Sequence, residues 1–371
     1  MKIALLGTRG VPAAYGGFET LVENVGRRLA ERGYEVTVYC RPHMVSGRFR
    51  TYRGMRLVYL PTIATKHLDT VVHTLVCTVH MALRHRPDVA VFFIAGNSPL
   101  AALSRLLGIP SIINVDGLDS RRVKWNGYAR RYLRWAERNA PRCANATITD
   151  SRSVQTLYRE EYGAESHFIP YGSDMEGKDT GEYLQRYGLK SRGYILFVGR
   201  LVAENNAHVL VEAFEGLDTD LRLVVVGDAP YADEYQKALF ATQDKRVRFT
   251  GYLFGDGYRE LTRNAAIFVA PTEVGSTHPV IVEAMAAGNC VVVNDYQPNL
   301  ETIGDAGVSY PGREGAAGLR RVLAELLDDP SRVERFRELA VDRARAEYSW
   351  DAVTTAYERL AKDVIAGRPG S

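Results

Sequence analysis

"MKIALLGTRGVPAAYGGFETLVENVGRRLAERGYEVTVYC", residues 1–40, is the stretch of this chain that decides its fold class. The apolar run at 2–6 predicts a buried strand, and the apolar spacing at 18–32 predicts a helix that stops at Gly33. Residues 35–40 predict a second strand. A strand, a glycine-rich loop, a helix and another strand follow each other in this order in parallel α/β sheets.

The alternation of strands and helices continues beyond this opening and then restarts. Further strands are predicted at 55–60, 88–96, 111–117 and 146–151, and in the second series at 193–200, 222–229, 246–252, 266–271, 289–296 and 307–310. An α/β fold with two doubly wound sheets is therefore predicted, with helices on both faces of each sheet. The polar, glycine-rich stretch 171–193 is interpreted as the linker between them.

The expected domains are two Rossmann-like units, residues 1–172 and 173–349. The helical pattern at about 350–371 is expected to pack back on the first unit. A chain of 371 residues agrees with this division, because a single hydrophobic core of that size is unusual.

The composition is that of an ordinary globular protein. Hydrophobic residues make up 46% and charged residues 25% of the chain, and the formal net charge of +3 gives no reason to expect a nucleic-acid partner. The chain has no apolar run long enough to span a membrane and no signal-peptide pattern, so we expect a cytoplasmic protein. Its four cysteines are scattered, without metal-binding spacing, and are expected to be reduced.

The glycine-rich loop after the first strand is a candidate binding site. Ligands of doubly wound sheets bind beyond the carboxyl ends of the strands. Gly16 and Gly17 would let a ligand approach the backbone, and the helix that begins near Phe18 would direct free N–H groups at an anion. The glycine spacing is not the GxGxxG of dinucleotide-binding loops, which argues against an NAD-dependent oxidoreductase. A plain surface turn is the alternative.

A second candidate site lies in the second unit. Arg200 ends a predicted strand, where a guanidinium can hold a phosphate through two hydrogen bonds. A short helix is predicted at about 279–287, and its free N–H groups favour phosphate binding by the residues before it, Gly275, Ser276 and Thr277. Glu283 lies one turn into this helix, where its carboxylate would accept hydrogen bonds from ribose hydroxyls. A surface arginine and a solvated glutamate are the alternatives.

These motifs resemble those of the retaining glycosyltransferases of family 4, which have the GT-B fold. The similar stretches are "YGGFETLVENVGRRLAERGYEVTVYCR" (15–41), "FIPYGSD" (168–174), "ILFVGRL" (195–201), "HPVIVEAMAAG" (278–288) and "YSWDAVTTAYERL" (348–360). The opening of the chain, with "NVDG" (114–117) and "RLVAENNAH" (200–208), is most similar to a subgroup rich in bacterial rhamnosyltransferases. Members of that subgroup build surface polysaccharides on lipid-linked acceptors.

The resemblance implies roles for individual residues. Gly16 and Gly17 match the glycine pair that faces the donor diphosphate. Arg200 matches the arginine that binds this diphosphate. Glu283 matches the second glutamate of the family's Glu-x7-Glu motif, which holds the nucleoside sugar. The first unit would then be the acceptor side, and the second unit would bind the nucleotide sugar.

Two positions depart from the family pattern. The first glutamate of the motif falls on Gly275, and the nearest acid is Glu273, so recognition of the transferred sugar must differ in a way compatible with a 6-deoxy sugar. The family's phosphate-binding lysine is replaced by Asn205. Arg200, the helix N-termini and either Arg9 or His278 are then expected to carry the charge of the leaving group.

The predicted reaction uses no metal ion or other cofactor. Charge develops on the departing diphosphate and must be stabilised. The sequence shows no convincing pair of carboxylates for Mg²⁺ or Mn²⁺, and GT-B enzymes generally need no metal. The predicted catalytic residues are Asp116, Arg200 and Glu273, with Asp116 orienting the acceptor hydroxyl or, alternatively, serving only as a turn residue. Arg9 and Tyr15 are predicted to contact the acceptor together with Asp116.

Residues 121–138, "RRVKWNGYARRYLRWAER", combine many arginines with aromatic residues at helical spacing. A cationic helix with an aromatic face can lie on an anionic membrane. The alternative is a solvated basic face over an aromatic stripe that belongs to the core.

The sequence therefore predicts a retaining hexosyltransferase of cell-surface polysaccharide synthesis. The expected donor is a nucleotide-diphosphate sugar, dTDP-L-rhamnose, and the expected acceptor is a lipid-linked saccharide. Peripheral contact with the inner face of an anionic membrane is expected through 121–138. The alternatives are a UDP-hexose-dependent transferase acting on a small soluble acceptor, and an inactive module that binds nucleotide sugar or glycan.

Overall fold

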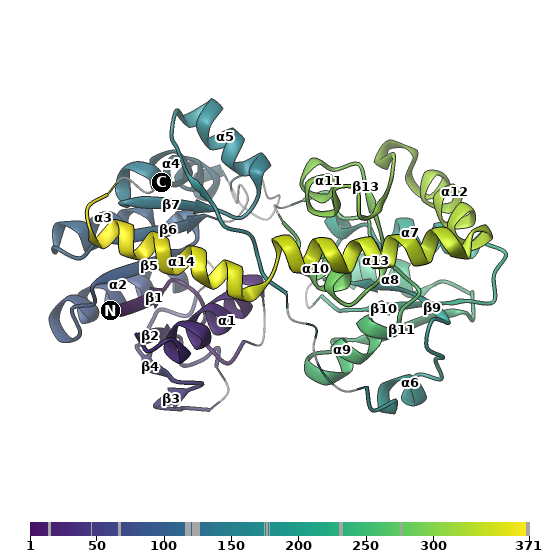
Figure 1. Ribbon diagram of the computed structural model, residues 1–371, viewed down its shortest axis with the longest axis horizontal. Helices are drawn as coiled ribbons and strands as arrows, with labels where there is room; N and C mark the ends of the chain where they lie inside the picture. The colour runs from purple at the N-terminus through teal and green to yellow at the C-terminus, as the bar shows by residue number, and fades with distance from the viewer. Residues whose placement is uncertain are drawn as a thin grey trace. The chain divides into compact units, whose positions relative to one another are not determined.

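The structure, a computed structural model, describes residues 1–13, 16–45, 47–65, 68–115, 120, 127–173, 175, 177, 179–229, 233–274 and 277–368. The chain forms two compact units (Figure 1). The first unit contains Met1–Gly172 and Trp350–Ser371, and the second contains Ser173–Ser349. The chain therefore passes from one unit to the other twice, after Gly172 and before Trp350.

The first unit is built on an 8-stranded sheet in the order β3-β4-β2-β1-β5-β6-β7-β8. All neighbouring strands are parallel except the short β3, which is antiparallel to β4. Ile3 in the central β1 is paired with Val36 on one side and Val89 on the other. The strands are β1 (Lys2–Leu6), β2 (Glu35–Cys40), β3 (Thr51–Tyr52), β4 (Met55–Tyr59), β5 (Val89–Phe93), β6 (Ser111–Val115), β7 (Ala146–Thr149) and β8 (His167–Phe168).

Helices cover both faces of this sheet. Ile3 and Leu5 pack in the core layer of α1 and α14, whereas Ala4 and Leu6 pack in the layer of α2, α3, α4 and α5. Because both faces are buried, the central strands β1 and β5 carry apolar side chains toward both faces. The helices are α1 (Gly17–Glu31), α2 (Asp69–Arg84), η1 (Ala95–Asn97), α3 (Ser98–Leu106), α4 (Gly127–Cys143), α5 (Arg152–Tyr162) and α14 (Trp350–Ile365).

The second unit repeats this architecture on a 6-stranded parallel sheet in the order β11-β10-β9-β12-β13-β14. One core layer contains α7, α8 and α12, and the other contains α9, α10, α11 and α13. Its strands are β9 (Tyr194–Val198), β10 (Arg222–Val226), β11 (Val247–Gly251), β12 (Ile267–Ala270), β13 (Cys290–Asn294) and β14 (Val308–Tyr310). Its helices are α6 (Glu182–Arg186), η3 (Ala203–Asn205), α7 (Ala207–Glu215), α8 (Asp233–Phe240), α9 (Gly255–Asn264), α10 (Pro279–Ala286), α11 (Gln297–Ile303), η4 (Gly312–Glu314), α12 (Gly315–Asp328) and α13 (Pro330–Glu347). The predicted doubly wound α/β fold is confirmed.

The strand order reverses direction once in each sheet. The chain runs outward on one side of β1 and then returns to place β5 on its other side, and it does the same with β9 and β12. Open α/β sheets bind ligands beyond the carboxyl ends of the strands at these reversal points. The loops that follow β1, β9 and β12 are therefore where each unit is built to bind a ligand.

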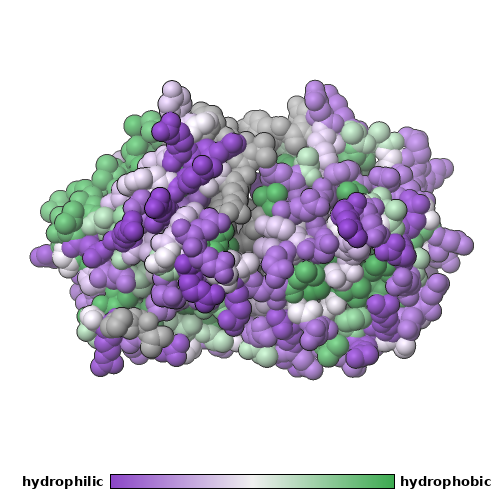
Figure 2. Space-filling model, turned by 90° about the horizontal axis from the view of Figure 1, so that it is seen from above, coloured by the Kyte–Doolittle hydropathy of each residue, from purple (hydrophilic) through white to green (hydrophobic). Residues whose placement is uncertain are grey.

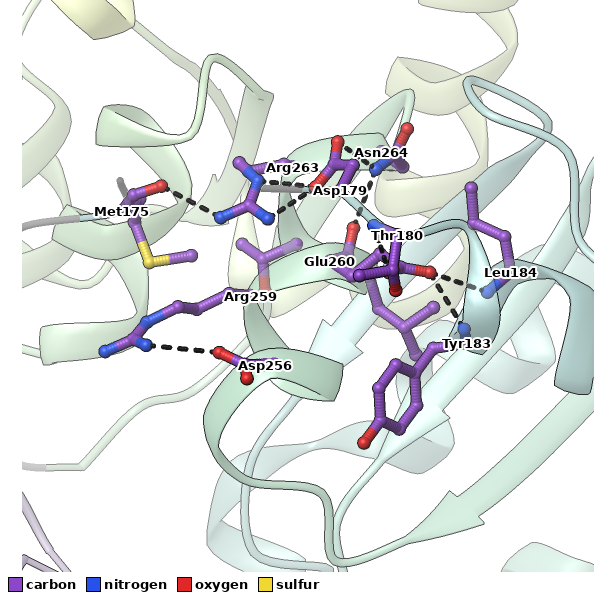
Figure 3. Close-up of polar contacts among 12 residues, drawn as sticks. Met175, Asp179, Thr180, Tyr183, Leu184, Asp256, Arg259, Glu260, Arg263 and Asn264 are labelled. Carbon is purple, nitrogen blue, oxygen red and sulfur yellow. Dashed lines mark hydrogen bonds and ion pairs between the residues drawn. The ribbon is translucent and has the colours of Figure 1, made fainter. Parts of the chain in front are cut away.

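The stretch 171–193, predicted as a linker, contains the helix α6 and is held to α9 by Glu260 (Figure 3). One carboxylate oxygen of Glu260 accepts hydrogen bonds from the N–H and the hydroxyl of Thr180, at 3.1 and 2.8 Å. The other accepts from the N–H groups of Tyr183 and Leu184, at 2.9 and 3.0 Å. Burial disfavours the charged carboxylate, but these hydrogen bonds outweigh it and lower the pKa of Glu260.

The aromatic residues of α4 lie on its exposed side. The buried side chains of α4 are Leu133, Ala136, Glu137 and Ala140. Tyr128 and Trp135 are 88% and 50% exposed. The alternative of an aromatic core stripe is therefore wrong for the described part of the stretch, while 121–126 lie outside the described residues.

The four cysteines are free, as expected, and three of them are buried. Among the helices of the described ranges, none combines the length and the apolar composition needed to cross a membrane.

Candidate active site

Arg200 lies two residues after the end of β9, and its side chain is exposed at the carboxyl edge of the sheet. Asn205, which stands in place of the family's lysine, donates its side-chain N–H to the carbonyl of Arg200 at 2.8 Å. It thereby shapes the turn that presents this arginine. Gly227 has a φ of +144°, and a Cβ atom there would collide with the carbonyl of Gly199. The glycines let the ends of β9 and β10 approach closely beside Arg200.

Three asparagine side chains fix the loop after β12. Asn206 and Asn294 both donate to the carbonyl of Pro271, at 3.0 and 2.9 Å. Asn299 donates to the carbonyl of Thr272 at 2.8 Å. The loop is thus attached to the N-cap of α7, to the end of β13 and to α11. Sequence reasoning missed these asparagines, because their partners are backbone carbonyls far away in the chain.

His278, the residue before α10, has an oxygen atom within hydrogen-bond distance of each ring nitrogen. Its Nε2 lies 2.9 Å from the carbonyl of Val274, which can only accept. Its Nδ1 lies 3.0 Å from Oδ1 of Asn299. The amide nitrogen of Asn299 already faces two acceptors, the carbonyl of Thr272 and Oδ1 of Asn294, so Oδ1 of Asn299 must accept as well. With an acceptor at each nitrogen, both hydrogen bonds form together only when the ring carries two protons and a positive charge.

Glu283 projects from α10 and is held by a residue that the sequence did not indicate. The hydroxyl of Tyr258, in α9, donates a hydrogen bond to Oε2 of Glu283. Burial raises the pKa of Glu283, although the hydrogen bond from Tyr258 works in the opposite direction. The flanking Val282 and Ala284 are buried, which fixes the backbone from which the carboxylate projects. Tyr258 orients one carboxylate oxygen and leaves the other to a different donor.

The remaining predicted donor-site residues lie around the same loop. Glu273 is exposed, and its N–H lies 3.5 Å from the carbonyl of Glu204. Thr277 is buried. Gly275 and Ser276 lie outside the described residues.

In the first unit, Gly16 is the N-cap of α1 and Gly17 its first residue. The carboxylate of Glu19 accepts a hydrogen bond from the N–H of Arg9 at 3.0 Å, and the Arg9 guanidinium lies 3.9 Å from the same oxygen. Glu19 is buried, and its contacts with Arg9 attach the loop after β1 to the first turn of α1. The predicted acceptor residues Tyr15 and Asp116 lie outside the described residues.

A buried ion pair also holds the loop after β1, through Arg41, the residue that follows β2. The guanidinium of Arg41 lies 2.9 Å from Oδ2 of Asp69 and 3.3 Å from the carbonyl of Gly7. The N–H of Arg41 donates to the carbonyl of Arg9 at 2.9 Å. His43 approaches the same carboxylate, at 3.4 Å. Both Arg41 and Asp69 escaped sequence reasoning, because a single arginine and a single aspartate carry no motif.

The arrangement in the second unit suits a phosphorylated ligand with a nucleoside. Arg200 supplies positive charge, and the ring of His278 and the N-terminal turn of α10 supply N–H donors. Glu283 supplies an oriented acceptor. The described ranges contain no group of three or more His, Cys, Asp or Glu that could hold a metal ion.

Comparison with known proteins agrees with this geometry. Residues 192–329 match the family described as "Glycosyl transferases group 1", and residues 1–174 match a "Domain of unknown function (DUF1972)". The alpha-D-kanosaminyltransferase of Streptomyces kanamyceticus is 27% identical over 67% of this chain and 69% of its own length. The O-antigen chain mannosyltransferase B of Escherichia coli is 29% identical over 46% of each chain.

Solved structures share the fold. Sucrose-phosphate synthase from Thermosynechococcus elongatus superimposes with a TM-score of 0.83 at 18% identity, covering 98% of this chain and 99% of that one. Anabaena HepE in complex with UDP-glucose superimposes with a TM-score of 0.77 at 19% identity, covering 98% of this chain and 100% of that one. The match to the group 1 family thus lies in the second unit, and the chain is a glycosyltransferase with the GT-B fold.

Proposed function

We propose that this glycosyltransferase transfers L-rhamnose from dTDP-L-rhamnose to a lipid-linked saccharide, with retention of anomeric configuration. The donor binds in the second unit, at the point where the strand order reverses. The acceptor binds at the glycine-rich loop of the first unit.

The donor assignment is based on two loops that lie at the same point, where the strand order reverses. Arg200 follows β9, and the loop fixed by Asn206 follows β12, its neighbour in the sheet. The diphosphate lies against Arg200 and the N-terminus of α10. Glu283, oriented by Tyr258, accepts hydrogen bonds from the ribose.

The charge of the leaving group is carried without a metal ion. When the glycosidic bond breaks, negative charge grows on the diphosphate, and fixed positive groups stabilise it most when no reorganisation is needed. Arg200 and the imidazolium of His278 supply this charge, so that His278 compensates for the lysine that Asn205 replaces.

The identities of the sugar and the acceptor are inferred from the resemblance to rhamnosyltransferases. For the sugar, a second argument is Gly275, which stands where the family's sugar-binding glutamate is expected. The two relatives are named for kanosamine and mannose transfer. The solved structure of HepE holds UDP-glucose, so a UDP-hexose is the competing donor class. The exposed arginines and aromatic residues of α4 support a membrane-bound acceptor, because such a helix binds anionic surfaces.

The decisive experiment is a thermal-shift panel of UDP, dTDP, GDP and their sugars, followed by turnover assays with the strongest donors. Ligands that bind the native state raise the melting temperature by mass action. The proposal expects the largest shift with dTDP-L-rhamnose and its slow hydrolysis without acceptor. A preference for a UDP-hexose would replace the donor, and binding without any hydrolysis or transfer would contradict the proposed reaction.

A further inference from the structure

A cavity of the first unit lies beside β4, near the β3 edge of the sheet. It has a volume of about 650 Å³ and opens between β4 and the C-terminal end of α2, where its charged lining residues are Arg50, Arg56, His80, Arg84 and His85. A neighbouring cavity of about 450 Å³ shares three of these residues and reaches the first residues of β1 and β2. The glycine-rich loop follows the last residue of β1. Since β2 lies between β4 and β1 in the sheet, this cavity is separated sideways from the loop that follows β1.

The guanidinium groups of this cavity have no carboxylate partner. Across the described ranges, Arg50, Arg56 and Arg84 form no ion pair, although many other arginines of the unit do, such as Arg53 with Glu23. One acid, Glu35, lines the neighbouring cavity, and its carboxylate lies 3.9 Å from the ammonium of Lys2. Cations that share a cavity repel each other unless an anion lies between them.

The pKa values of two histidines are lowered in the cavity. The pKa of His80 is lowered by burial and by the charges of Arg84 and Arg56. The pKa of His85 is lowered by burial, by the same two arginines and by His80 and Lys2. Both rings are therefore neutral at pH 7, and an anion bound between the arginines would raise both pKa values again.

The tautomer of His80 leaves a further donor for a ligand. The buried hydroxyl of Tyr39 lies 3.2 Å from Nδ1 of His80, and burial raises the pKa of Tyr39 so that it keeps its proton. His80 Nδ1 is the acceptor within reach of this hydroxyl among the described residues, so the proton of neutral His80 is on Nε2. Donors dominate the charged part of the cavity wall, as expected for an anion site.

An apolar stripe of α2 runs beside the cavity. Leu75, Val79 and Leu83 follow each other at intervals of one helical turn and are 42%, 42% and 78% exposed. Val79 and Leu83 directly precede the cavity residues His80 and Arg84 in the helix. Figure 2 shows hydrophobic surface gathered at the end of the first unit where Figure 1 places α2 and α3. A ligand with a phosphate and a hydrocarbon chain would match both features.

We propose that this cavity is a second ligand site, which binds a phosphate-bearing anion of at least two negative charges through Arg50, Arg56 and Arg84. The anion is either a soluble phosphorylated compound or the head group of a lipid phosphate whose chain lies along the stripe of α2. The site lies in the first unit and does not depend on the proposed donor or acceptor.

The test uses the full chain, inorganic pyrophosphate and the ring signals of His80 and His85 in NMR titrations. These signals report this cavity alone, even where pyrophosphate also binds near Arg200. We expect saturable shifts and a raised pKa for both rings. The double variant Arg56→Gln, Arg84→Gln should weaken this binding roughly tenfold for each guanidinium removed. The matched control is Arg159→Gln, an exposed arginine of α5, which should change nothing.

A second arm distinguishes the two sources of phosphate. Vesicles of phosphatidylcholine with phosphatidic acid are compared with vesicles in which phosphatidylserine supplies the same charge. Stronger binding to phosphatidic acid that the double variant and Leu83→Ser each weaken assigns the lipid source. Saturable binding of pyrophosphate without any preference for phosphatidic acid assigns a soluble ligand. If neither probe shifts the two rings, the proposal is overturned.

Discussion

The Nδ1 atom of His278 lies 3.0 Å from Oδ1 of Asn299, while its Nε2 atom lies 2.9 Å from the carbonyl of Val274. Loss of either ring proton would place a lone pair against an oxygen, which costs more than the deprotonation of a solvated histidine. We expect both ring nitrogens to be protonated at pH 7.5 in nitrogen-15 NMR spectra.

The charge of His278 should increase the affinity for the diphosphate group and leave the affinity for the nucleoside unchanged. Replacement of His278 by Gln keeps a hydrogen-bonding side chain but removes the charge, so the affinity for a nucleoside diphosphate should decrease about tenfold at low salt. Calorimetry with the free nucleoside should show little change. Equal losses for both ligands would mean that His278 only maintains the shape of the loop.

Glu283 should determine the affinity for the nucleotide. The variant Glu283→Ala loses a charged acceptor for the ribose, and we expect roughly 1.5–3 kcal/mol, or about 10- to 150-fold, in the dissociation constant. Glu338→Ala, at an exposed glutamate of α13, is the matched control. An unchanged dissociation constant in calorimetry would contradict the assignment.

The raised pKa of Glu283 also predicts a pH dependence. The carboxylate forms at a higher pH than in an exposed glutamate, so donor affinity should increase with pH across a range above the ordinary glutamate value. Tyr258→Phe removes a hydrogen bond that favours the charged form, and should move this range to still higher pH. Glu283→Gln should abolish the dependence.

The sequence predicted the layers of the fold better than the contacts that position the site. Apolar strands and helical periodicity are local signals, and they located the strands around Ile3 and Ile195 and the helix that carries Glu283. The role of Tyr258 depends on how α9 packs beside α10, which no spacing reveals. The stretch 171–193 is polar in composition, and the contact that organises it comes from Glu260, far along the chain.

Glu260 should hold this stretch in place. In Glu260→Gln the carboxylate is lost and at least one N–H donor of Thr180, Tyr183 or Leu184 is left without an acceptor. Hydrogen exchange of these amides should become markedly faster, while amides of β9 should be less affected. Because the pKa of Glu260 is lowered in the folded state, its contribution to stability is present above the ordinary glutamate pKa and is lost as the pH falls below it.

Turnover should not require a divalent cation. Fixed charges at Arg200 and His278 take the place of a metal beside the diphosphate, and the described ranges provide no carboxylate cluster to hold one. We expect full activity after treatment with EDTA. Loss of activity that Mg²⁺ or Mn²⁺ restores would show that the leaving group is stabilised in another way.

Binding of the chain to anionic vesicles should depend on α4. Arg130, Arg131 and Arg134 are exposed on this helix beside Tyr128 and Trp135. Each cation near an anionic surface gains about 1 kcal/mol, and salt weakens this attraction. Replacement of the three arginines by Glu should abolish cosedimentation with anionic vesicles at low salt. Turnover of a short-chain soluble acceptor should remain, because the donor residues belong to the second unit.

The matched control for α4 is the same change of charge in the second unit, with the exposed Arg313, Arg335 and Arg345 replaced by Glu. If this control loses vesicle binding to the same extent, net charge and not α4 is responsible. If the unmodified chain never binds anionic vesicles at low salt, the face of α4 is only solvated. The lipid-linked acceptor would then depend on the resemblance to rhamnosyltransferases alone.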